Sequence, residues 1–418
     1  MSDILNIIHE FQKDCPCGHK HSTTVEDVVI ESGAAFRVGE ILQKNNFSNH
    51  ILLVADQNTL KAADGIQKSL DGMEVTYQIY DDFRLADMEH VQEIESMIAG
   101  TDISVLSVGT GSLNDICRLA AARQQKKLCL FATAPSMDGF ASYSAPIVAN
   151  GFKASYPAKS PEVIIGDTKI LADAPVNLKS SGFGDMIAKY IGLVDWQISA
   201  LLTGEYYCEK IAALTRSAVD ELVALSDRVT VRDEYTAGKI FEALLKTGIG
   251  MSFARNSRPA SGSEHIISHL LECKELQQGK LPNLHGEDVG VCTLEMLKYY
   301  RHLAEHDSIQ TDSESVDWED VFAFYGSMAE DVKKLNFPDN VIDGVDKDAL
   351  REHWSEIRAI IRSIPDYETC RAAMEQAHCK LTVSDIGKDH TLFDACVKYS
   401  PYMRHRLTLL RLKDMIKI

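Results

Sequence analysis

The chain has 418 residues and a mass of 46.4 kDa, enough for about two or three domains with large buried cores, which excludes a small disulfide-stapled scaffold. Acidic side chains outnumber basic ones by 61 to 43, and the net charge of −18 should repel phosphate backbones, so we expect no nucleic-acid partner. The N-terminal residues lack the charge order of a secretory signal, and no apolar stretch approaches the roughly 18 residues of a membrane helix. The ten cysteines are widely spread, so we expect a cytoplasmic protein with reduced thiols and no membrane insertion.

Residues 1–27 form an N-terminal extension with one unusual segment, CPCGHKH. Cys15, Cys17, His19 and His21 place four soft metal ligands within seven residues. Structural zinc sites usually separate their cysteines by two or more residues, and here only one residue intervenes. The segment is therefore either a local metal site or an ordinary polar loop.

Between residues 28 and 177, short apolar runs alternate with helical patterns. The runs are continuous rather than alternating in polarity, which is typical of strands buried on both faces of a parallel sheet. We predict an α/β domain with a Rossmann-like sheet over 28–177. The predicted strands are 50–55, 75–80, 103–108, 127–132 and 163–165.

Beyond residue 177 the strand signals almost vanish. Segments rich in Ala, Leu, Glu, Lys and Met, such as 212–229 and 238–245, favour helices. We therefore predict an all-α C-terminal domain over 178–418.

A glycine-rich turn follows the third predicted strand and opens a helix. Its sequence, GTGSLND over 109–115, lets the backbone approach a ligand and offers free N–H groups to phosphate. It departs from the dinucleotide fingerprint, because Asn114 stands at the third glycine position. The best ribose-binding acid, Asp56, ends an earlier strand, which indicates an unusual strand order if a dinucleotide binds. Taken alone, the turn could be purely structural.

A second loop, TAPSMDGFAS over 133–142, leaves the next predicted strand. Ligands of open α/β sheets bind outside the carboxyl ends of the strands, where this hydroxyl-rich loop must lie. Ser, Asp and Gly are also common turn residues, so the loop by itself does not identify a site.

Among the residues of metal-ligand type in the helical half, four form a candidate set. Asp185 lies at the predicted start of a helix, His265 and His269 are four residues apart and share a helix face, and His285 follows soon after. The EHIISH segment has Ile266 where a zinc protease needs its catalytic glutamate, which disfavours a protease. Three such ligands with one vacant position would suit substrate activation by a Lewis acid.

Together these segments closely resemble the sn-glycerol-1-phosphate dehydrogenases, in particular their bacterial branch, within the group that also contains iron-containing alcohol dehydrogenases, glycerol dehydrogenase and dehydroquinate synthase. The resemblance is carried in order by GTGSLND, TAPSMDGFAS, SSGFGDMIAKY, NSRPASGSEHIISH and LHGEDVGV, from about residue 28 to beyond 291. Thr110 departs from the pattern, since many relatives have glycine there. The CPCGHKH segment and the residues after about 303 have no counterpart in it.

The resemblance implies a dehydroquinate synthase-like fold and a set of site residues. The implied metal ligands are Asp185, His265 and His285, holding zinc, with nickel or iron as alternatives, and the implied catalytic set adds His269. Substrate would contact Asp138, Asp185 and His269. The residues implied to hold NAD(H) or NADP(H) are Asp56, Gly111, Ser112, Leu113, Asn114, Asp115, Thr133, Ala134, Pro135, Ser136 and Ser142.

The implied reaction is reduction of dihydroxyacetone phosphate to sn-glycerol 1-phosphate, with the metal polarising the C2 carbonyl for hydride transfer. We expect Arg258 or Lys189 to bind the phosphate of this small phosphorylated triose, Asp56 to favour NADH over NADPH, and the protein to be a homodimer or larger homo-oligomer. Two alternatives stay open: a glycerol dehydrogenase that acts on unphosphorylated glycerol, and a dehydroquinate synthase-like cyclase.

Overall fold

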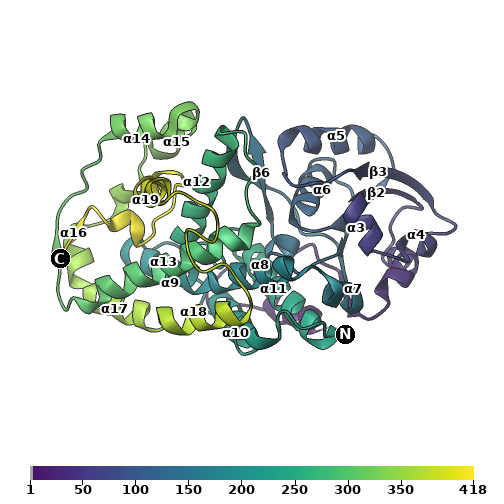
Figure 1. The fold of residues 1–418 in the computed structure, drawn as a ribbon, viewed down its shortest axis with the longest axis horizontal. Helices are drawn as coiled ribbons and strands as arrows, with labels where there is room; N and C mark the ends of the chain where they lie inside the picture. The colour runs from purple at the N-terminus through teal and green to yellow at the C-terminus, as the bar shows by residue number, and fades with distance from the viewer. Residues whose placement is uncertain (1–2) are drawn as a thin grey trace.

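A computed structural model describes residues 3–418 and shows a parallel sheet at one end of the molecule and a large group of helices at the other. In Figure 1 the sheet and its helices, in purple and blue, lie on the right, and the green and yellow helices of the C-terminal half lie on the left. Among the described residues, none of the helices is both long and apolar enough to cross a membrane. The predicted division into an α/β part and a helical part is confirmed.

The sheet has six parallel strands in the order β1-β8-β5-β4-β2-β3. The five predicted strands are all present in this sheet, and the sequence analysis missed only its first strand, whose short DVVIE run carries charges at both ends. The strands are β1 Asp27–Glu31, β2 His50–Asp56, β3 Glu74–Tyr80, β4 Ser104–Gly109, β5 Leu128–Ala132 and β8 Val163–Asp167.

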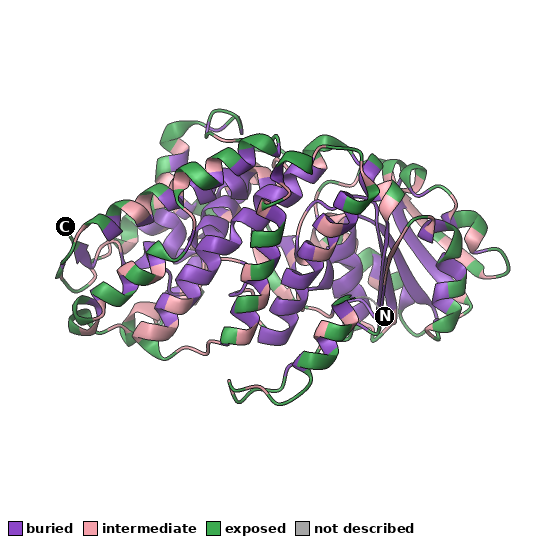
Figure 2. Cartoon of the chain, turned by 90° about the horizontal axis from the view of Figure 1, so that it is seen from below, coloured by how far each residue is buried: buried purple, intermediate pink, exposed green. Residues whose placement is uncertain are grey.

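Helices cover both faces of this sheet, as continuous apolar strands require. Neighbouring residues of β2 enter different cores: Leu53 packs in the cluster on one face and Leu52 in the cluster on the other. Figure 2 shows the inner strands in the colour of buried residues, with the exposed residues on the outer surface. The helices of this half are α2 Val38–Lys44, α3 Gln57–Ala62, α4 Ile66–Ser69, α5 Met88–Ile98, α6 Gly111–Arg123 and α7 Thr168–Asp173.

The strand order creates a crevice between β2 and β4. The chain runs from β2 outward to β3 and then returns to β4 on the other side of β2. Ala55 pairs with Val108, so Asp56 and Gly109 end adjacent strands. Such a reversal of strand order is where open α/β sheets bind their ligands.

The C-terminal half is almost entirely helical, as predicted. Asp185 does not open a helix, however: it lies in the last turn of α8, because the helix begins nine residues earlier, directly after Pro175. The predicted helix 212–229 ends at Val223, and a short 3-10 turn follows it. The helices are α8 Val176–Ile187, α9 Lys189–Thr203, α10 Glu209–Val223, α11 Glu234–Ala254, α12 Ser263–Gln277, α13 His285–Glu305, α14 Trp318–Tyr325, α15 Ala329–Asn336, α16 Lys347–Glu352, α17 Trp354–Arg362, α18 Tyr367–Gln376 and α19 His390–Tyr399.

Three smaller elements complete the fold. An antiparallel hairpin of β6 Ser144–Ala149 and β7 Phe152–Pro157 projects from the sheet half, and β9 Gln310–Thr311 pairs with β10 Ile416–Lys417 near the C-terminus. The N-terminal helix α1 Asp3–Phe11 buries Ile4, Ile8 and Phe11. Phe11 stacks on Phe253 of α11 with ring centroids 4.5 Å apart, so the N-terminal extension is joined to the helical half.

Candidate functional site

A cleft lies between the carboxyl ends of the strands and the helical half. The turns after β4 and β5, the β6–β7 hairpin and the starts of α12 and α13 contribute to its lining. Two adjoining hollows form the cleft, and both are lined by Gly111 and Ser112 of α6 and by His285 of α13. The glycine-rich turn and the predicted histidines therefore face the same space.

Close contact between α8 and α13 brings Asp185 and His285 together. A Cβ atom built on Gly286 would lie 1.8 Å from the Ser181 carbonyl oxygen, and one on Gly184 would lie 2.3 Å from the Gly286 carbonyl oxygen. Only glycine allows the two backbones to approach this closely. The SSGFGD and HGEDVG segments thus encode the crossing that sets the spacing of the two side chains.

Asp185, His265 and His285 come from three different helices and converge on one point. Their nitrogen and oxygen ligand atoms all lie within 4.8 Å of one another, and His265 Nε2 is 3.4 Å from Asp185 Oδ1. Asp185 and His265 are buried, whereas the His285 side chain is 27% exposed and faces the cleft. This set of two imidazoles and one carboxylate is suited to a divalent transition metal with an open coordination position.

Two glutamates that the sequence analysis did not identify orient the histidines. His265 Nδ1 lies 2.6 Å from Glu264 Oε1, and His285 Nδ1 lies 3.2 Å from Glu272 Oε1. A carboxylate on Nδ1 fixes the tautomer that leaves Nε2 free to coordinate, and this arrangement is common behind metal-binding histidines. Glu264 directly precedes His265 in sequence, so a search for a carboxylate beside each histidine could have found it.

Lys189 sits beneath this group and neutralises two buried carboxylates. Its Nζ lies 2.7 Å from both Asp138 Oδ2 and Asp185 Oδ1. Burial acts to raise the pKa of Asp185, but the Lys189 ammonium together with His265 and His285 holds that pKa well below its usual value. Burial and the Asp185 charge raise the pKa of Asp138. Lys189 is fully buried, so the expectation that it binds a substrate phosphate is not supported by its position.

His269 lies one turn beyond His265 and also lines the cleft. Its Nδ1 is 3.3 Å from an Nη atom of Arg404, which also donates to the Lys153 carbonyl oxygen at 2.9 Å. Burial and the Lys153 charge lower the pKa of His269 well below its usual value, so the ring is neutral. Arginine only donates, so Nδ1 accepts and Nε2 carries the proton.

Three cations that the sequence analysis missed lie at this side of the cleft: Lys153, Arg404 and Arg406. Lys153 lines both hollows and pairs with Glu272, and Arg406 donates to Ser257 and Ser261, two residues of the lining. Burial lowers the pKa of Arg406 to about 9, and the charges of Arg258 and Arg404 add to the effect. The region is therefore electropositive within a strongly acidic protein.

Arg258, the other residue expected to bind phosphate, is wrong for that role. Its guanidinium donates to Glu205, to Ser199 and to the Leu407 carbonyl oxygen, and the residue is 4% exposed. These contacts occupy the charged group and fix the C-terminal segment that carries Arg404 and Arg406. No periodicity in the sequence marks those two arginines as part of a site, because they lie in an irregular segment.

On the sheet side, the start of α6 faces the cleft. The Thr110 side chain at the N-cap forms no capping hydrogen bond within the described chain, so the first N–H groups of the helix remain available to an anion. Gly111 and Ser112 line the cleft, whereas Leu113 is buried in the core. The Asn114 side chain is fully buried, and its amide atoms have no hydrogen-bond partner among residues 3–418.

The remaining predicted cofactor residues fall into two groups. Asp115, Ser136 and Ser142 line the cleft, with Asp115 and Ser142 both bound to Arg118. Thr133, Ala134 and Pro135 are buried behind it. Asp56 caps α3 by accepting from the Thr59 N–H at 2.8 Å, and it also accepts from the Phe83 N–H at 3.3 Å, beside the segment that lines the cleft over 84–86.

Comparisons with known proteins agree with this architecture. The family described as iron-containing alcohol dehydrogenase matches residues 29–175. The NAD(P)+ glycerol-1-phosphate dehydrogenase of Bacillus velezensis is 33% identical over 293 residues, covering 68% of this chain and 74% of the relative. The enzyme of that name from Halalkalibacterium halodurans is 27% identical over 418 residues, 98% of each chain.

A solved structure shows the same fold at lower sequence similarity. The NADH-dependent butanol dehydrogenase A of Thermotoga maritima superposes with a TM-score of 0.59 at 14% identity, covering 94% of both chains. On the sequence relatives, whose similarity extends through the helical half, the chain belongs to the glycerol-1-phosphate dehydrogenase family of the iron-containing alcohol dehydrogenases.

Proposed function

We propose that the protein catalyses the reversible reduction of dihydroxyacetone phosphate to sn-glycerol 1-phosphate with NADH or NADPH. The observation that carries this proposal is that the Asp185, His265 and His285 ligand set and a cationic group occur at one cleft. Lys153 of that group lines the cleft, and Arg404 and Arg406 contact residues of the lining. The ligand set suits activation of a carbonyl, and the cations suit a phosphate. Membership of the glycerol-1-phosphate dehydrogenase family supports both halves of this interpretation.

Asp185, His265 and His285 would hold one divalent metal ion, which we propose to be zinc. The convergent ligand atoms and the two carboxylate-oriented imidazoles fit such an ion. When bound, the ion would act as a Lewis acid toward the C2 carbonyl oxygen and stabilise the negative charge that develops there. A second grouping, His269 with Glu272 and His285, is a weaker candidate, because Glu272 already binds Lys153 and His285 Nδ1.

His269 and Asp138 would position the substrate. With Nδ1 turned to Arg404, His269 presents its Nε2–H to the cleft, where it can donate to a substrate hydroxyl or phosphate oxygen. Asp138 lines the same hollow, and its backbone N–H donates to Asp185 Oδ2 at 2.9 Å, which fixes this loop against the ligand set. Lys189 joins the two carboxylates through its ammonium group without facing the cleft.

The cofactor would lie across the carboxyl ends of β2 and β4. The uncapped start of α6 suits its pyrophosphate, and Asp56 at the end of the neighbouring strand suits an adenine ribose hydroxyl. The nicotinamide supplies the hydride, and the residues around it set its orientation. The negative charge of Asp56 would disfavour the 2′-phosphate of NADPH, so we propose a modest preference for NADH.

Two alternative functions, a glycerol dehydrogenase and a dehydroquinate synthase-like cyclase, fit the residues of the site less well. A glycerol dehydrogenase has no phosphate to bind, and the positive charges of Lys153 in the lining and of Arg404 and Arg406 directly behind it would then have no explanation. A cyclase of the dehydroquinate synthase type is disfavoured because Asp185 stands where that group has glutamate. A phosphorylated substrate is therefore the better fit.

One assay separates these functions. The purified enzyme should reduce dihydroxyacetone phosphate roughly two orders of magnitude better than dihydroxyacetone, because an unpaired phosphate-binding cation costs a few kcal/mol. In the reverse direction with NAD, it should oxidise sn-glycerol 1-phosphate. Oxidation of sn-glycerol 3-phosphate alone, or of free glycerol in preference to either phosphate, would contradict the proposal.

A further inference from the structure

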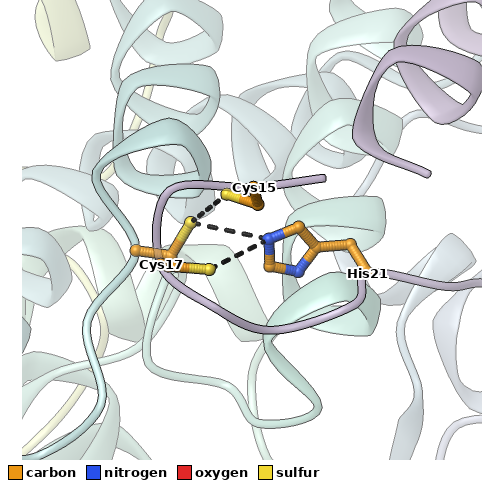
Figure 3. Close-up of side chains that lie close together, drawn as sticks. Cys15, Cys17 and His21 are labelled. Atoms are coloured by element: carbon orange, nitrogen blue, oxygen red, sulfur yellow. Dashed lines mark hydrogen bonds between the residues drawn. The ribbon is translucent and has the colours of Figure 1, made fainter. Parts of the chain in front are cut away.

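The N-terminal CPCGHKH segment meets a distant cysteine in a compact cluster away from the cleft. The cluster consists of Cys15, Cys17, His21 and Cys208, whose sulfur and nitrogen ligand atoms all lie within 4.8 Å of one another. Figure 3 shows the side chains of Cys15, Cys17 and His21 turned toward one another. Cys208, at the N-cap of α10, brings the fourth ligand from 187 residues beyond His21. The sequence analysis grouped His19 with these ligands and missed Cys208.

The spacing of these atoms matches a tetrahedral zinc site. With zinc–sulfur bonds of about 2.3 Å and zinc–nitrogen bonds of about 2.0 Å, the edges of a tetrahedron are about 3.8 Å between sulfurs and about 3.5 Å between sulfur and nitrogen. Cys15 Sγ lies 3.7 Å from Cys208 Sγ, and His21 Nε2 lies 3.4 Å from Cys17 Sγ and 3.7 Å from Cys208 Sγ. Three edges of the polyhedron therefore have the length that a central zinc ion requires.

The surroundings of His21 fit a ligand rather than a packed core histidine. Its Nδ1 lies 3.2 Å from the Phe253 carbonyl oxygen, so Nδ1 carries the proton and Nε2 faces the three sulfurs unprotonated. A backbone carbonyl on the far ring nitrogen is a common support for metal-binding histidines. The His19 ring instead lies against Tyr206 with centroids 4.2 Å apart, and its Nδ1 contacts the Cys17 carbonyl oxygen.

The local backbone explains how Cys15 and Cys17, which are separated by a single residue, can both be ligands of the same ion. Gly18 adopts a left-handed conformation with φ of 78°, and its N–H donates to the Cys15 carbonyl oxygen at 2.9 Å, which turns the chain back over both sulfurs. The Tyr206 hydroxyl lies 3.6 Å from Cys17 Sγ and can donate to a thiolate there. Cys208 and His21 are buried, and Cys15 and Cys17 are half-buried.

We propose that Cys15, Cys17, His21 and Cys208 bind a structural zinc ion that is separate from the metal of the cleft. Four protein ligands fill a tetrahedral zinc ion and leave no position for a substrate, so this site is closed where the Asp185 site is open. The ion would tie the N-terminal extension to the start of α10 and to the end of α11. The Phe253 carbonyl lies just before the irregular segment that carries Ser257 and Ser261 into the cleft lining, so the ion would also brace that side of the cleft.

Metal content distinguishes the two sites. Wild-type protein purified with a thiol reductant should contain about two metal ions per chain, and Cys17→Ser, Cys208→Ser and His265→Ala should each contain about one. His19→Gln is the matched control, since it changes the same segment and should leave the content at about two. The folded Cys17→Ser protein should unfold at a lower temperature than wild type while retaining its reductase activity at permissive temperature.

A spectroscopic measurement keeps the proposal testable if the cysteine variants do not fold. Protein loaded with Co²⁺ in place of zinc should show a sulfur-to-cobalt charge-transfer band in the wild type and equally in His265→Ala, because only the cysteine site has thiolate ligands. A cobalt-loaded wild type without that band would overturn the proposal. So would a Cys15–Cys208 disulfide found by mass spectrometry in a metal-free protein, or a Cys17→Ser variant that keeps the full metal content.

Discussion

The two sides of the cleft are built by different means. On the sheet side, apart from the Asp56 carboxylate, the candidate cofactor contacts come mainly from main-chain features: the start of α6 and the turns that follow β4 and β5. On the helical side, the candidate metal ligands are single side chains on α8, α12 and α13 that meet at one point. A parallel sheet places its strand ends at one edge whatever the side chains are. Three helices, by contrast, bring their ligand side chains to one point only if the packing contacts between the helices are all preserved. Substitutions should therefore have larger effects in the helical half.

The largest effect should follow the loss of a ligand. His265→Ala and His285→Ala should each remove the cleft metal and lower kcat/KM for dihydroxyacetone phosphate by roughly three orders of magnitude or more, since a Lewis acid contributes several kcal/mol. Metal analysis and steady-state kinetics would measure both effects. His302→Ala is the control, because this exposed histidine of α13 contacts Glu305 and His306 at the end of the helix and no described residue of the cleft lining. A His285→Ala enzyme with full metal and full rate would show that the ligand set is misassigned.

The next largest effect should come from the cations. Arg404→Ala and Lys153→Met should each lower kcat/KM for dihydroxyacetone phosphate by about a hundredfold and lower the slow reduction of dihydroxyacetone much less, since only the phosphorylated substrate loses an ionic partner. Arg371→Ala, at an exposed position on α18, is the control. Equal losses on both substrates would mean that these residues support the fold or the metal rather than the phosphate.

The sequence analysis predicted the three candidate metal ligands that the fold brings together but not the cations, and the reason is physical. Asp185, His265 and His285 lie in segments where the chemistry and the packing glycines occur together, so the motifs identify them. Arg404 and Arg406 lie in an irregular segment far along the chain, and their position depends on Arg258 and Asp195 holding that segment through the Leu407 carbonyl and the Leu409 N–H. Such tertiary contacts leave no local pattern.

The same contrast holds for the elements of the fold. Long apolar strands such as β2 and β4 could be predicted because both faces are buried, and the parallel sheet followed from them. The start of α8 could not be predicted from its glycines, because Gly184 serves the crossing with α13 and Gly182 the contact with the Pro135 carbonyl, rather than a helix boundary. Cys208 was missed because a lone cysteine carries no spacing signal.

The glycine crossing itself should be sensitive. In Gly286→Ala the new Cβ would meet the Ser181 carbonyl oxygen, a backbone atom that cannot move aside, and the free energy of unfolding should fall by about 2 kcal/mol. Because α8 carries Asp185 and α13 carries His285, metal affinity should fall with it. Chemical denaturation would measure the free energy of unfolding, and metal titration would measure the affinity. Gly344→Ala is the control: nothing lies within 4 Å of the added Cβ, so this variant should keep both the stability and the metal affinity of the wild type. A stable Gly286→Ala protein with full metal affinity would remove the basis for the contrast between the two halves.

The smallest effect should be found on the sheet side, at Asp56. Asp56→Ser keeps a good capping residue at the start of α3, so the strand end and its helix should hold their structure, but it removes a negative charge beside the proposed adenine ribose. The ratio of kcat/KM for NADPH to that for NADH should rise several-fold, because the 2′-phosphate no longer faces a like charge. Asp366→Ser, which alters the equivalent cap of α18 far from the sheet, should leave the ratio unchanged. An unchanged ratio in Asp56→Ser would place this carboxylate outside the cofactor site, and a complete loss of activity with the fold intact would show that a single side chain is as critical on the sheet side as on the helical side.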